Sequence, residues 1–352
     1  MTPVHVVVPD GLDDPARPSG GNAYDRRVCS ELGRMGWRVR LHEVPGSWPH
    51  PDAAALAALA GVVERLPDDA VVLLDGLVAS TAPETLVPQA GRMRLVALVH
   101  MPLGHRPTHR DAREREGPVL AAAAAVVTTS AWSRRTLLEL YGLPGDRVHV
   151  AEPGVDAAAL APGTATAAAL LCVGAVIPGK GHDVLLDALA TIADLPWDCV
   201  CVGSLDRDPA FARSVQRRVL GNGLRDRVRF PGPRVAANLD RTYVSADLVV
   251  LASRVETYGM VVTEALARGL PVVAADVGGV REALGHGAGA VRPGMLVPPD
   301  DPAELAAALR AWLDDTDVRF AWRRAARERR ASLPEWSTTA SVVADVLAGA
   351  AR

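Results

Sequence analysis

The chain has 352 residues, of which 49% are hydrophobic, and a formal net charge of -3. This length exceeds what one hydrophobic core usually supports, and the apolar content is too high for a disordered chain, so we expect two folded domains. A protein whose main partner is nucleic acid normally carries a strong excess of basic residues. The slightly acidic balance therefore argues against a nucleic-acid partner.

The cysteines and the apolar runs bear on the cellular compartment in which the protein works. The four cysteines lie in apolar or helical stretches without metal-ligand spacing, so we expect reduced core residues and no bound metal: Cys29, Cys172, Cys199 and Cys201. Met1 leads directly into a strand-like segment with no signal-peptide pattern, and no apolar run approaches the roughly 18 residues of a membrane-spanning helix. We expect a cytoplasmic protein without a transmembrane segment, for which peripheral membrane contact stays open.

The first part of the chain alternates short apolar runs with helical periodicity, which is typical of a parallel α/β sheet. The first strand is followed by a helix expected over residues 22–35. The expected strands are residues 5–8, 71–74, 95–99, 126–129 and 148–151.

The pattern breaks at residues 157–168, which are rich in Ala, Pro, Gly and Thr, and then starts again. The second set of expected strands is 170–173, 199–202, 229–230, 248–251, 272–274 and 295–297. Further helices are expected over residues 182–192, 312–332 and 337–350. This order predicts two Rossmann-like halves joined by a linker, with a cleft between them.

Lys180 is the only lysine, so 37 of the 38 basic side chains are arginine. It lies in a glycine-rich turn, residues 174–181, between an expected strand and an expected helix. Backbone N–H groups of such a turn and the following helix N-terminus bind anions, and a compact ammonium suits phosphate oxygens. The turn therefore predicts a phosphate site. The alternative is a surface lysine left by chance in an arginine-biased chain.

Two features of the first half point to the same cleft. The turn Ser19-Gly20-Gly21 precedes a helix and admits a phosphate or a sugar close to the backbone. His100 ends the strand 95–99, and ligands of parallel sheets bind outside the carboxyl ends of the strands. A histidine that only hydrogen-bonds locally at the strand end is the alternative.

The third feature is the block of residues 253–273, which carries two glutamates eight positions apart. Glu256 precedes a glycine turn, and Glu264 falls within a largely apolar helix, where a carboxylate is costly unless it accepts hydrogen bonds. Such a pair can bind two polyols, a sugar at the turn and a ribose diol at the helix. Local pairing of Glu264 with a solvated Glu256 is the alternative.

In this order and spacing, these motifs resemble the glycosyltransferase family 4 enzymes, which are retaining transferases of the GT-B fold. The resemblance covers nearly the whole chain and includes residues 153–156, 246–247, 278–282 and 336–337. It implies an α/β architecture of two Rossmann-like domains whose parallel sheets face a central cleft. Residues 1–160 would form the acceptor domain, residues 161–335 the nucleotide-sugar domain, and residues 336–352 a helix that returns to the first domain.

The resemblance also implies a reaction and its residues. A hexosyl group would move from a nucleoside-diphosphate sugar of the UDP or GDP type to a hydroxyl of a small-molecule, glycan or lipid acceptor, without a metal or another cofactor. Lys180 would contact the diphosphate, Glu256 the transferred sugar, and His100 the sugar in the cleft. Glu264 would bind the ribose. The remaining donor-binding positions would be Gly20, Gly21, Gly174, Arg254, Thr257, Tyr258 and Gly259.

One departure from the family and three rivals remain. The family commonly has an arginine directly after the first glycine of the phosphate turn, where this chain has Ala175, so Arg254 or Arg134 is the candidate replacement. A P-loop ATPase is disfavoured because the turn ends in Gly181 instead of Ser or Thr. Another GT-B enzyme, such as an epimerase or a phosphorylase, and a non-catalytic nucleotide-sugar-binding subunit stay open.

Overall fold

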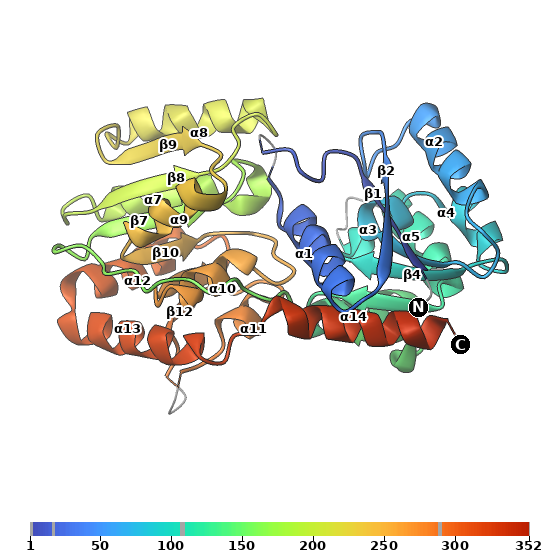
Figure 1. The fold of residues 1–352 in the computed structure, drawn as a ribbon. Coiled ribbons are helices and arrows are strands. Elements are labelled where there is room, and N and C mark those ends of the chain that lie inside the picture. Colours follow the sequence, from blue (N-terminus) through green and yellow to red (C-terminus); the bar gives the residue numbers. More distant parts are fainter. Residues whose placement is uncertain (1–2, 16–17, 106–109, 288–290, 352) are drawn as a thin grey trace. The chain divides into compact units, whose positions relative to one another are not determined.

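The computed structural model describes residues 3–15, 18–105, 110–287 and 291–351. Contacts divide the chain into two compact units (Figure 1). Unit 1 comprises Met1–Asp14, Ser19–Gly154 and Pro334–Arg352, and unit 2 comprises Pro15–Pro18 and Val155–Leu333. Within the described ranges, no helix combines the length and the apolar content needed to cross a bilayer.

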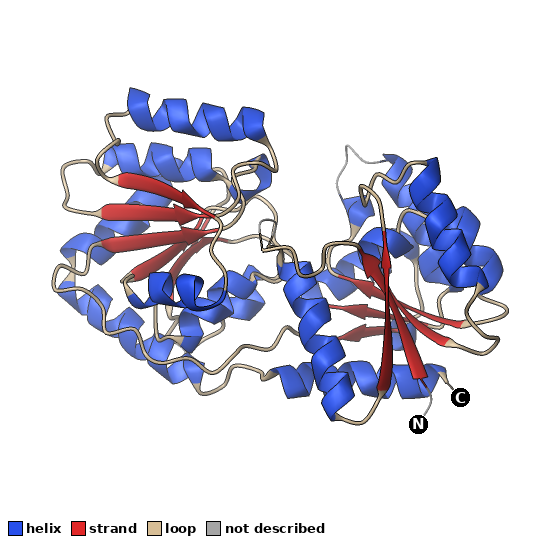
Figure 2. Ribbon diagram, turned by 45° about the horizontal axis from the view of Figure 1, so that its top comes forward, coloured by secondary structure: helices blue, strands red, loops and turns tan. Residues whose placement is uncertain are grey.

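Unit 1 is built on six parallel strands in the order β2-β1-β3-β4-β5-β6. Helices lie on both faces of this sheet, which explains why its inner strands are continuous apolar runs (Figure 2). The strands are β1 (Pro3–Pro9), β2 (Arg38–Val44), β3 (Val71–Asp75), β4 (Arg94–Val99), β5 (Ala125–Thr128) and β6 (Val148–Val150). The helices are α1 (Gly20–Arg34), α2 (Ala53–Glu64), α3 (Gly76–Ala79), α4 (Pro83–Leu86), α5 (Arg110–Ala122), α6 (Ala131–Tyr141) and α14 (Trp336–Ala350), with short 3-10 turns η1 (Val87–Gln89), η2 (Leu103–His105) and η3 (Gly145–Arg147).

Unit 2 is built on a second set of six parallel strands, in the order β12-β11-β10-β7-β8-β9. Alternate residues of each strand face opposite cores: Leu170 and Cys172 join one cluster, and Leu171 joins the other. The strands are β7 (Ala169–Val173), β8 (Asp198–Val202), β9 (Val228–Gly232), β10 (Leu248–Leu251), β11 (Val272–Ala275) and β12 (Gly294–Val297). The helices are α7 (His182–Thr191), α8 (Pro209–Gly221), α9 (Ala236–Val244), α10 (Met260–Ala267), α11 (Val280–Leu284), α12 (Pro302–Asp314) and α13 (Thr316–Arg330), with the 3-10 turn η4 (Pro178–Lys180).

These sheets confirm the predicted α/β class with two parallel sheets, and two details differ from the sequence reading. Strand β2 was not expected, because it is a sheet edge whose side chains, such as Arg38 and Arg40, are mostly exposed and polar. The single helix expected over residues 312–332 is wrong. It is two helices, since Asp315 accepts hydrogen bonds from the N–H groups of Asp317 and Val318 and starts α13 there.

The sheet orders show where ligands are expected to bind. In each unit the direction of strand winding reverses once, between β1 and β3 in unit 1 and between β7 and β10 in unit 2. Ligands of open α/β sheets bind outside the carboxyl ends of the strands at such a reversal. The loops after β7 and β10 hold Lys180 and Glu256, and Asp75 ends β3.

Helix α14, near the carboxyl end of the chain, is part of unit 1, where it packs against α1 and the sheet. The Trp336 and Tyr24 rings meet edge to face with centroids 5.6 Å apart, and Thr339 Oγ1 donates to the Glu152 carbonyl at 2.7 Å. Gly154 has no room for a side chain, because a Cβ there would lie 2.3 Å from the Trp336 nitrogen. Gly154, where the chain leaves unit 1, therefore touches Trp336, which lies just after the chain re-enters unit 1 at Pro334.

Candidate functional site

The loop after β7 is held in one conformation by its backbone. The Gly174 N–H donates to the Val202 carbonyl at 2.8 Å, and the Val176 N–H donates to the Ser204 carbonyl at 2.9 Å. Gly181 has φ +64°, and a Cβ there would lie 1.9 Å from the Ala252 carbonyl oxygen. Only glycine fits this position, which excludes the hydroxyl that a P-loop needs at the same place.

Lys180 leaves this loop and reaches the loop after β10. Its Nζ is paired with Glu256 Oε1, which also accepts a hydrogen bond from Ser253 Oγ at 2.8 Å. The Lys180 side chain passes Gly174, where a Cβ would stand 3.5 Å from the lysine methylenes. The two side chains are 28% and 12% exposed, so the pair is largely withdrawn from water but still reachable. The structure thus brings together two of the three predicted catalytic residues.

The loop that carries Glu256 is shaped by close backbone contacts. Gly278 has φ +56°, and a Cβ there would lie only 1.5 Å from the Glu256 carbonyl oxygen. The predicted donor-binding residues Thr257, Tyr258 and Gly259 follow directly, and Gly259 starts α10 with φ +95°. Tyr258 is buried among the apolar residues of unit 2, so its ring anchors the loop on that core.

Glu264 belongs to a separate group on α10. Its Oε2 accepts a hydrogen bond from the Tyr243 hydroxyl at 2.7 Å. The Arg268 guanidinium lies 4.6 Å from the centroid of the Tyr243 ring and donates to the Glu264 carbonyl at 2.8 Å. Burial raises the pKa of Glu264, and the Tyr243 hydrogen bond and the Arg268 charge oppose that rise. No hydrogen bond or ion pair joins Glu264 to Lys180 or Glu256 within the part of the chain that the structure describes.

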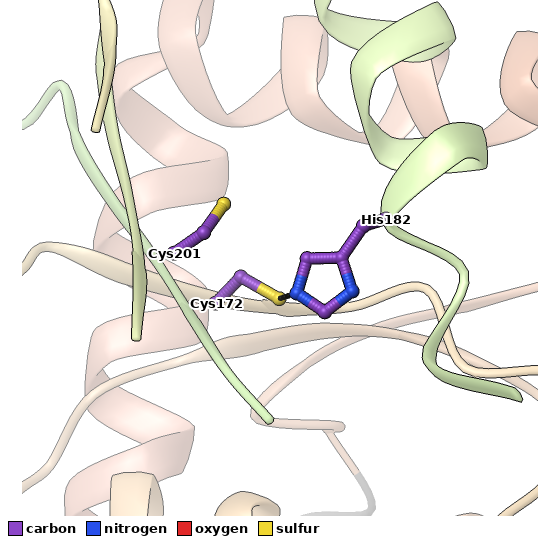
Figure 3. Close-up of side chains that lie close together, drawn as sticks. All are labelled: Cys172, His182 and Cys201. Carbon is purple, nitrogen blue, oxygen red and sulfur yellow. Dashed lines mark hydrogen bonds between the residues drawn. The ribbon is translucent and has the colours of Figure 1, made fainter. Parts of the chain in front are cut away.

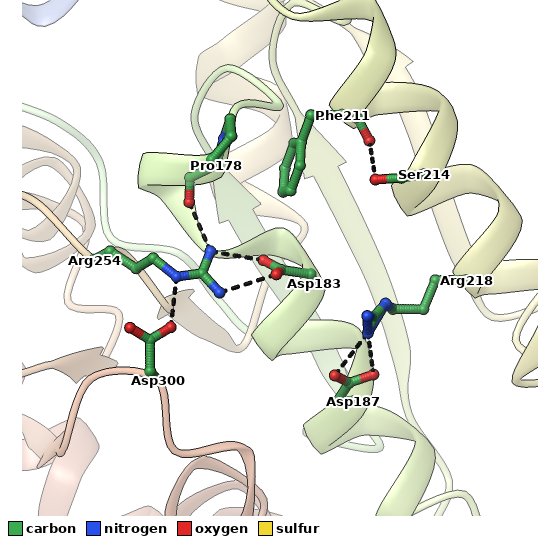
Figure 4. Close-up of polar contacts among 8 residues, drawn as sticks. All are labelled: Pro178, Asp183, Asp187, Phe211, Ser214, Arg218, Arg254 and Asp300. Atoms are coloured by element: carbon green, nitrogen blue, oxygen red, sulfur yellow. Dashed lines mark hydrogen bonds and ion pairs between the residues drawn. The ribbon is translucent and has the colours of Figure 1, made fainter. Parts of the chain in front are cut away.

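Arg254, the first candidate to replace the missing arginine at position 175, is already engaged (Figure 4). Its Nη1 and Nη2 each donate to Asp183 at 2.9 Å, its Nε is paired with Asp300, and Nη1 also donates to the Pro178 carbonyl at 2.7 Å. The pKa of Arg254 is raised, chiefly by the hydrogen bond to Asp183. Two carboxylates therefore already balance its charge, and its hydrogen bonds join the loop after β10 to the loop after β7 and to the start of α7.

Arg134, the second candidate, lies in unit 1. Its Nε donates to the Val148 carbonyl at 2.8 Å and its Nη2 to the Gly145 carbonyl at 2.7 Å. Both contacts are to the backbone beside β6, so Arg134 fixes the end of that strand. Among the described residues of unit 2, no arginine forms a hydrogen bond or an ion pair with Lys180 or Glu256. Within these residues, no second cation therefore stands in for the arginine that the family commonly has at the position of Ala175.

In unit 1 the third predicted catalytic residue, His100, is surrounded by two aspartates. Its Nε2 lies 2.7 Å from Asp25 Oδ1 and 3.5 Å from Asp75 Oδ2, and the two aspartate side chains are 3% and 4% exposed. Gly21 lies against the ring, because a Cβ there would be 3.3 Å from His100 Cδ2. Gly20 begins α1, and Ser19 caps that helix by accepting the Asn22 N–H at 3.1 Å.

Burial and charge shift the pKa values in this group in opposite directions. Burial alone would lower the pKa of His100, but the charge of Asp25, the hydrogen bond to it and the charge of Asp75 outweigh burial and raise that pKa to about 9. Burial, followed by the neighbouring Asp25, raises the pKa of Asp75. The two carboxylates thus favour the protonated, cationic form of the imidazole ring.

The predicted charged and ionisable residues therefore fall into four groups, centred on the Lys180–Glu256 pair, on Arg254, on Glu264 and on His100. Sequence reasoning did not single out Ser253, Tyr243, Asp25 or Asp75 as partners. A signal existed for the aspartates, since Asp75 directly ends an apolar strand and Asp25 falls on the inward stripe of α1 that also holds Gly21, Val28 and Leu32. Tyr243 had no such signal, because it lies on α9, outside every motif that the sequence analysis singled out.

Two clusters of described residues bring metal-type ligand atoms within 4.8 Å of one another. One is the His100 group, in which the 2.7 Å contact is a hydrogen-bond length. The other is Cys172 of β7, Cys201 of β8 and His182, the first residue of α7, with Cys172 Sγ 3.8 Å from His182 Nε2 (Figure 3). Sequence spacing did not reveal it, since its members come from two strands and a helix. The cysteines are free thiols in an apolar core, and the expected absence of a metal stays a prediction.

Comparisons with known proteins agree with this fold. Residues 3–159 match the family model described as Glycosyltransferase Family 4, and residues 167–315 match the model described as Glycosyl transferases group 1. Sucrose-phosphate synthase from Thermosynechococcus elongatus has a similar fold, with a TM-score of 0.79, 22% identity and 99% of each chain covered. HepE from Anabaena, solved with UDP and glucose, has a TM-score of 0.76 and 20% identity over 99% of this chain and 100% of that one.

Curated relatives are closer in sequence. The D-inositol 3-phosphate glycosyltransferase of Geodermatophilus obscurus is 35% identical over 284 residues, which are 75% of this chain and 61% of the relative. That of Jonesia denitrificans is 34% identical over 258 residues, covering 68% of this chain and 60% of the relative. The chain thus spans about three fifths of the length of these relatives. The two family models, which together match most of its length, place this chain in glycosyltransferase family 4.

Proposed function

We propose that this chain is a retaining glycosyltransferase that moves a hexosyl group from a nucleoside-diphosphate sugar to an acceptor hydroxyl. The observation that carries the proposal is the pairing of Lys180 with Glu256 at the point where strand winding reverses in unit 2. An ammonium beside backbone N–H groups suits a diphosphate, and a carboxylate suits sugar hydroxyls. The UDP and UDP-glucose bound to HepE support a donor of the UDP type.

The proposed chemistry places charge where the transition state needs it. Negative charge grows on the leaving diphosphate as the glycosidic bond breaks, so Lys180 and the amides of residues 174–181 act on the developing charge. The Lys180 charge is balanced by Glu256. Donor binding would place the diphosphate beside Lys180 and free Glu256 to accept hydrogen bonds from the transferred sugar. Glu264, held by Tyr243, would bind the ribose diol.

The two units would divide the substrates between them. Residues 161–335 would bind the donor, and residues 1–160 together with the terminal helix would bind the acceptor and present His100. The names of the curated relatives make D-inositol 3-phosphate the first acceptor to test among small molecules, glycans and lipids. A cytoplasmic site of action stays part of the proposal, since nucleotide sugars would have to reach the protein.

A second function is favoured by one specific observation. Ala175 removes a cation that the family commonly has, and Arg254 is neutralised by Asp183 and Asp300. A chain with weaker stabilisation of the leaving group could bind a nucleotide sugar without transferring it, as a non-catalytic subunit would.

One experiment separates these functions. UDP-, GDP- and dTDP-sugars are first ranked by the rise in melting temperature that they cause, because a ligand of the folded state stabilises by mass action. The best donor is then incubated with D-inositol 3-phosphate and other polyols, and proton NMR reports the anomeric configuration of the product. We expect a product with the configuration of the donor. An inverted product contradicts the proposal, a changed donor sugar indicates an epimerase, and binding without transfer to any acceptor supports the non-catalytic subunit.

A further inference from the structure

Cys172, His182 and Cys201 form a buried cluster in unit 2 that none of the proposed substrate contacts uses (Figure 3). Cys172 of β7 and Cys201 of β8 stand directly opposite each other on neighbouring parallel strands, and His182 is the first residue of α7. One ligand atom from each residue lies within 4.8 Å of the other two, and each residue is at most 2% exposed. The fold of unit 2 therefore gathers two thiols and an imidazole at one point of its core.

The imidazole of His182 lacks the hydrogen bonds that a buried ring normally forms. Its Nδ1 has no partner among the described residues, and its Nε2 faces the Cys172 sulfur at 3.8 Å. Sulfur is a weak hydrogen-bonding atom, and a buried polar group without a good partner costs free energy. A bound ion is one of the groups that account for such an atom in a folded protein. A cation that takes the Nε2 lone pair would give this ring the strong partner that it lacks.

The donor atoms select the class of ion. Thiolate and imidazole ligands suit soft ions such as Cu(I) and Zn(II), whereas magnesium and calcium take oxygen ligands. Structural zinc takes four protein ligands, and a zinc site with three protein ligands keeps a water molecule.

The number of donors then favours copper over zinc. The Cys199 sulfur lies 3.9 Å from that of Cys201, but Cys199 is not a member of the three-residue group. Apolar residues of the core surround the cluster, and a water molecule needs polar partners of its own. A dry site with three donors therefore fits Cu(I), an ion that accepts three ligands, better than Zn(II).

The charges of such a site can balance in the apolar core. As a sulfur–copper bond forms, the thiol loses its proton to solvent, and His182 binds through its neutral lone pair. No electron is transferred, so the ion stays Cu(I). With one of the two cysteines as a thiolate, the site carries no net charge, which limits the cost of burying an ion.

We propose that Cys172, His182 and Cys201 form a binding site for one Cu(I) ion at the base of the loop of residues 174–181. Cys172 lies just before this loop and His182 follows it directly, so the ion would tie together the two ends of the loop that carries Lys180. The site goes beyond the proposed function and does not depend on it, and the ion takes no part in the transfer. The expectation of no bound metal rested on spacing along the chain, which does not show donors that meet across neighbouring strands.

Copper retention tests the site without any substrate. The reduced protein is incubated with Cu(I) under nitrogen for several hours, because a buried cluster fills only through local opening, and is then passed through gel filtration with a competing Cu(I) chelator. We expect the wild type to retain one copper per chain. Cys172→Ala, Cys201→Ala and His182→Phe should retain none.

Two other cysteines supply the matched controls. Cys199→Ala removes a sulfur from the same strand and the same core as Cys201, and Cys29→Ala removes one from unit 1, so both variants should still retain one copper. Circular dichroism should show that every variant folds.

Several results would overturn the proposal. A wild type that retains no copper does so whether or not the variants fold, and so does equal retention by Cys172→Ala and the wild type. A loss in Cys199→Ala as large as in Cys201→Ala would refute the three-ligand assignment. Retention of Zn(II) without retention of Cu(I), measured in the same way, would refute the choice of ion.

Amide hydrogen exchange tests the position of the ion. Copper should slow the exchange of residues 174–181 in the wild type and in Cys199→Ala, because it ties the two ends of this loop together, and should leave Cys172→Ala unchanged. Slowing that is confined to other parts of the chain would contradict the proposed place. None of these measurements uses a nucleotide sugar, so their outcome stands even if the chain proves to transfer none.

Discussion

Lys180 and Glu256, 76 positions apart in the chain, neutralise each other at the carboxyl edge of the sheet of unit 2. The contact joins the loop after β7 to the loop after β10, the two strands between which the winding reverses. It places the only lysine of the chain beside the carboxylate expected to bind the sugar. The two residues should therefore act as a unit in folding as well as in function.

This coupling predicts a non-additive double-mutant cycle. In thermal or urea unfolding, the Lys180→Met and Glu256→Gln changes should show an interaction free energy of at least about 1 kcal/mol, because the pair is largely withdrawn from water. The exposed pair Arg310 and Asp194 is the matched control, with about 0.2–1 kcal/mol expected. A coupling no larger than that of the surface pair would mean that the Lys180–Glu256 contact contributes nothing specific.

A second prediction separates Glu264 from Glu256. Glu264→Gln should weaken binding of the free nucleoside diphosphate, since its carboxylate is expected on the ribose, whereas Glu256→Gln should spare that binding and impair use of the intact donor. Tyr243→Phe should follow Glu264→Gln, because it removes the hydroxyl that orients this carboxylate. Tyr141→Phe, which removes a hydroxyl bonded to Glu116 in unit 1, is the control. Calorimetric titration with UDP decides the matter, and equal losses in both glutamate variants would refute the two roles.

A third prediction concerns Ala175. Because Asp183 and Asp300 already neutralise Arg254, we expect no cation to replace the family's arginine from that position. Ala175→Arg should then tighten nucleoside diphosphate binding by roughly 1–3 kcal/mol, the scale of a charge-assisted hydrogen bond. Arg254→Ala should lower the melting temperature instead, because it removes the hydrogen bonds from the Arg254 side chain to Pro178 and Asp183. Unchanged affinity in Ala175→Arg would show that the charge is supplied from elsewhere.

A fourth prediction concerns the backbone that shapes the Glu256 loop. Gly278→Ala should destabilise the protein by more than about 3 kcal/mol, because a Cβ would overlap the Glu256 carbonyl oxygen in addition to the cost of positive φ. Gly223→Ala has φ +68° but nothing within 4 Å of the added carbon, so it should cost only about 1–2 kcal/mol. Similar losses in the two variants would show that the close approach is absent.

The sequence predicted the inner strands well because they are buried on both faces and read as continuous apolar runs, as β3 and β10 do. It did not predict β2, whose exposed edge position leaves arginines where apolar residues would mark a strand. The helix expected over residues 312–332 joined the last turn of α12 to α13, because the capping role of Asp315, which separates the two helices, was not recognised.

For the candidate site too, the sequence predicted residues with local signals but not the contacts between distant segments. Lys180, Glu256 and His100 could be found because each follows a strand or lies in a glycine turn, which are local features. Their partners could not be assigned from local features, since the Lys180–Glu256 and Asp25–His100 contacts join segments 76 and 75 positions apart. The engagement of Arg254 by Asp183 and Asp300 likewise depends on how the start of α7 and two loops meet.

One measurement tests the proposed function most directly. It compares the wild type with Lys180→Ala in the rate at which nucleoside diphosphate is released from the best-binding sugar donor. Loss of a charged contact to the leaving group should lower turnover by roughly 100-fold or more. Circular dichroism should confirm that the fold is kept, and Arg225→Ala, which removes an exposed charge from the same unit, should keep the wild-type rate. Near-normal turnover in Lys180→Ala would contradict the assignment of this loop to the diphosphate and with it the proposed mechanism.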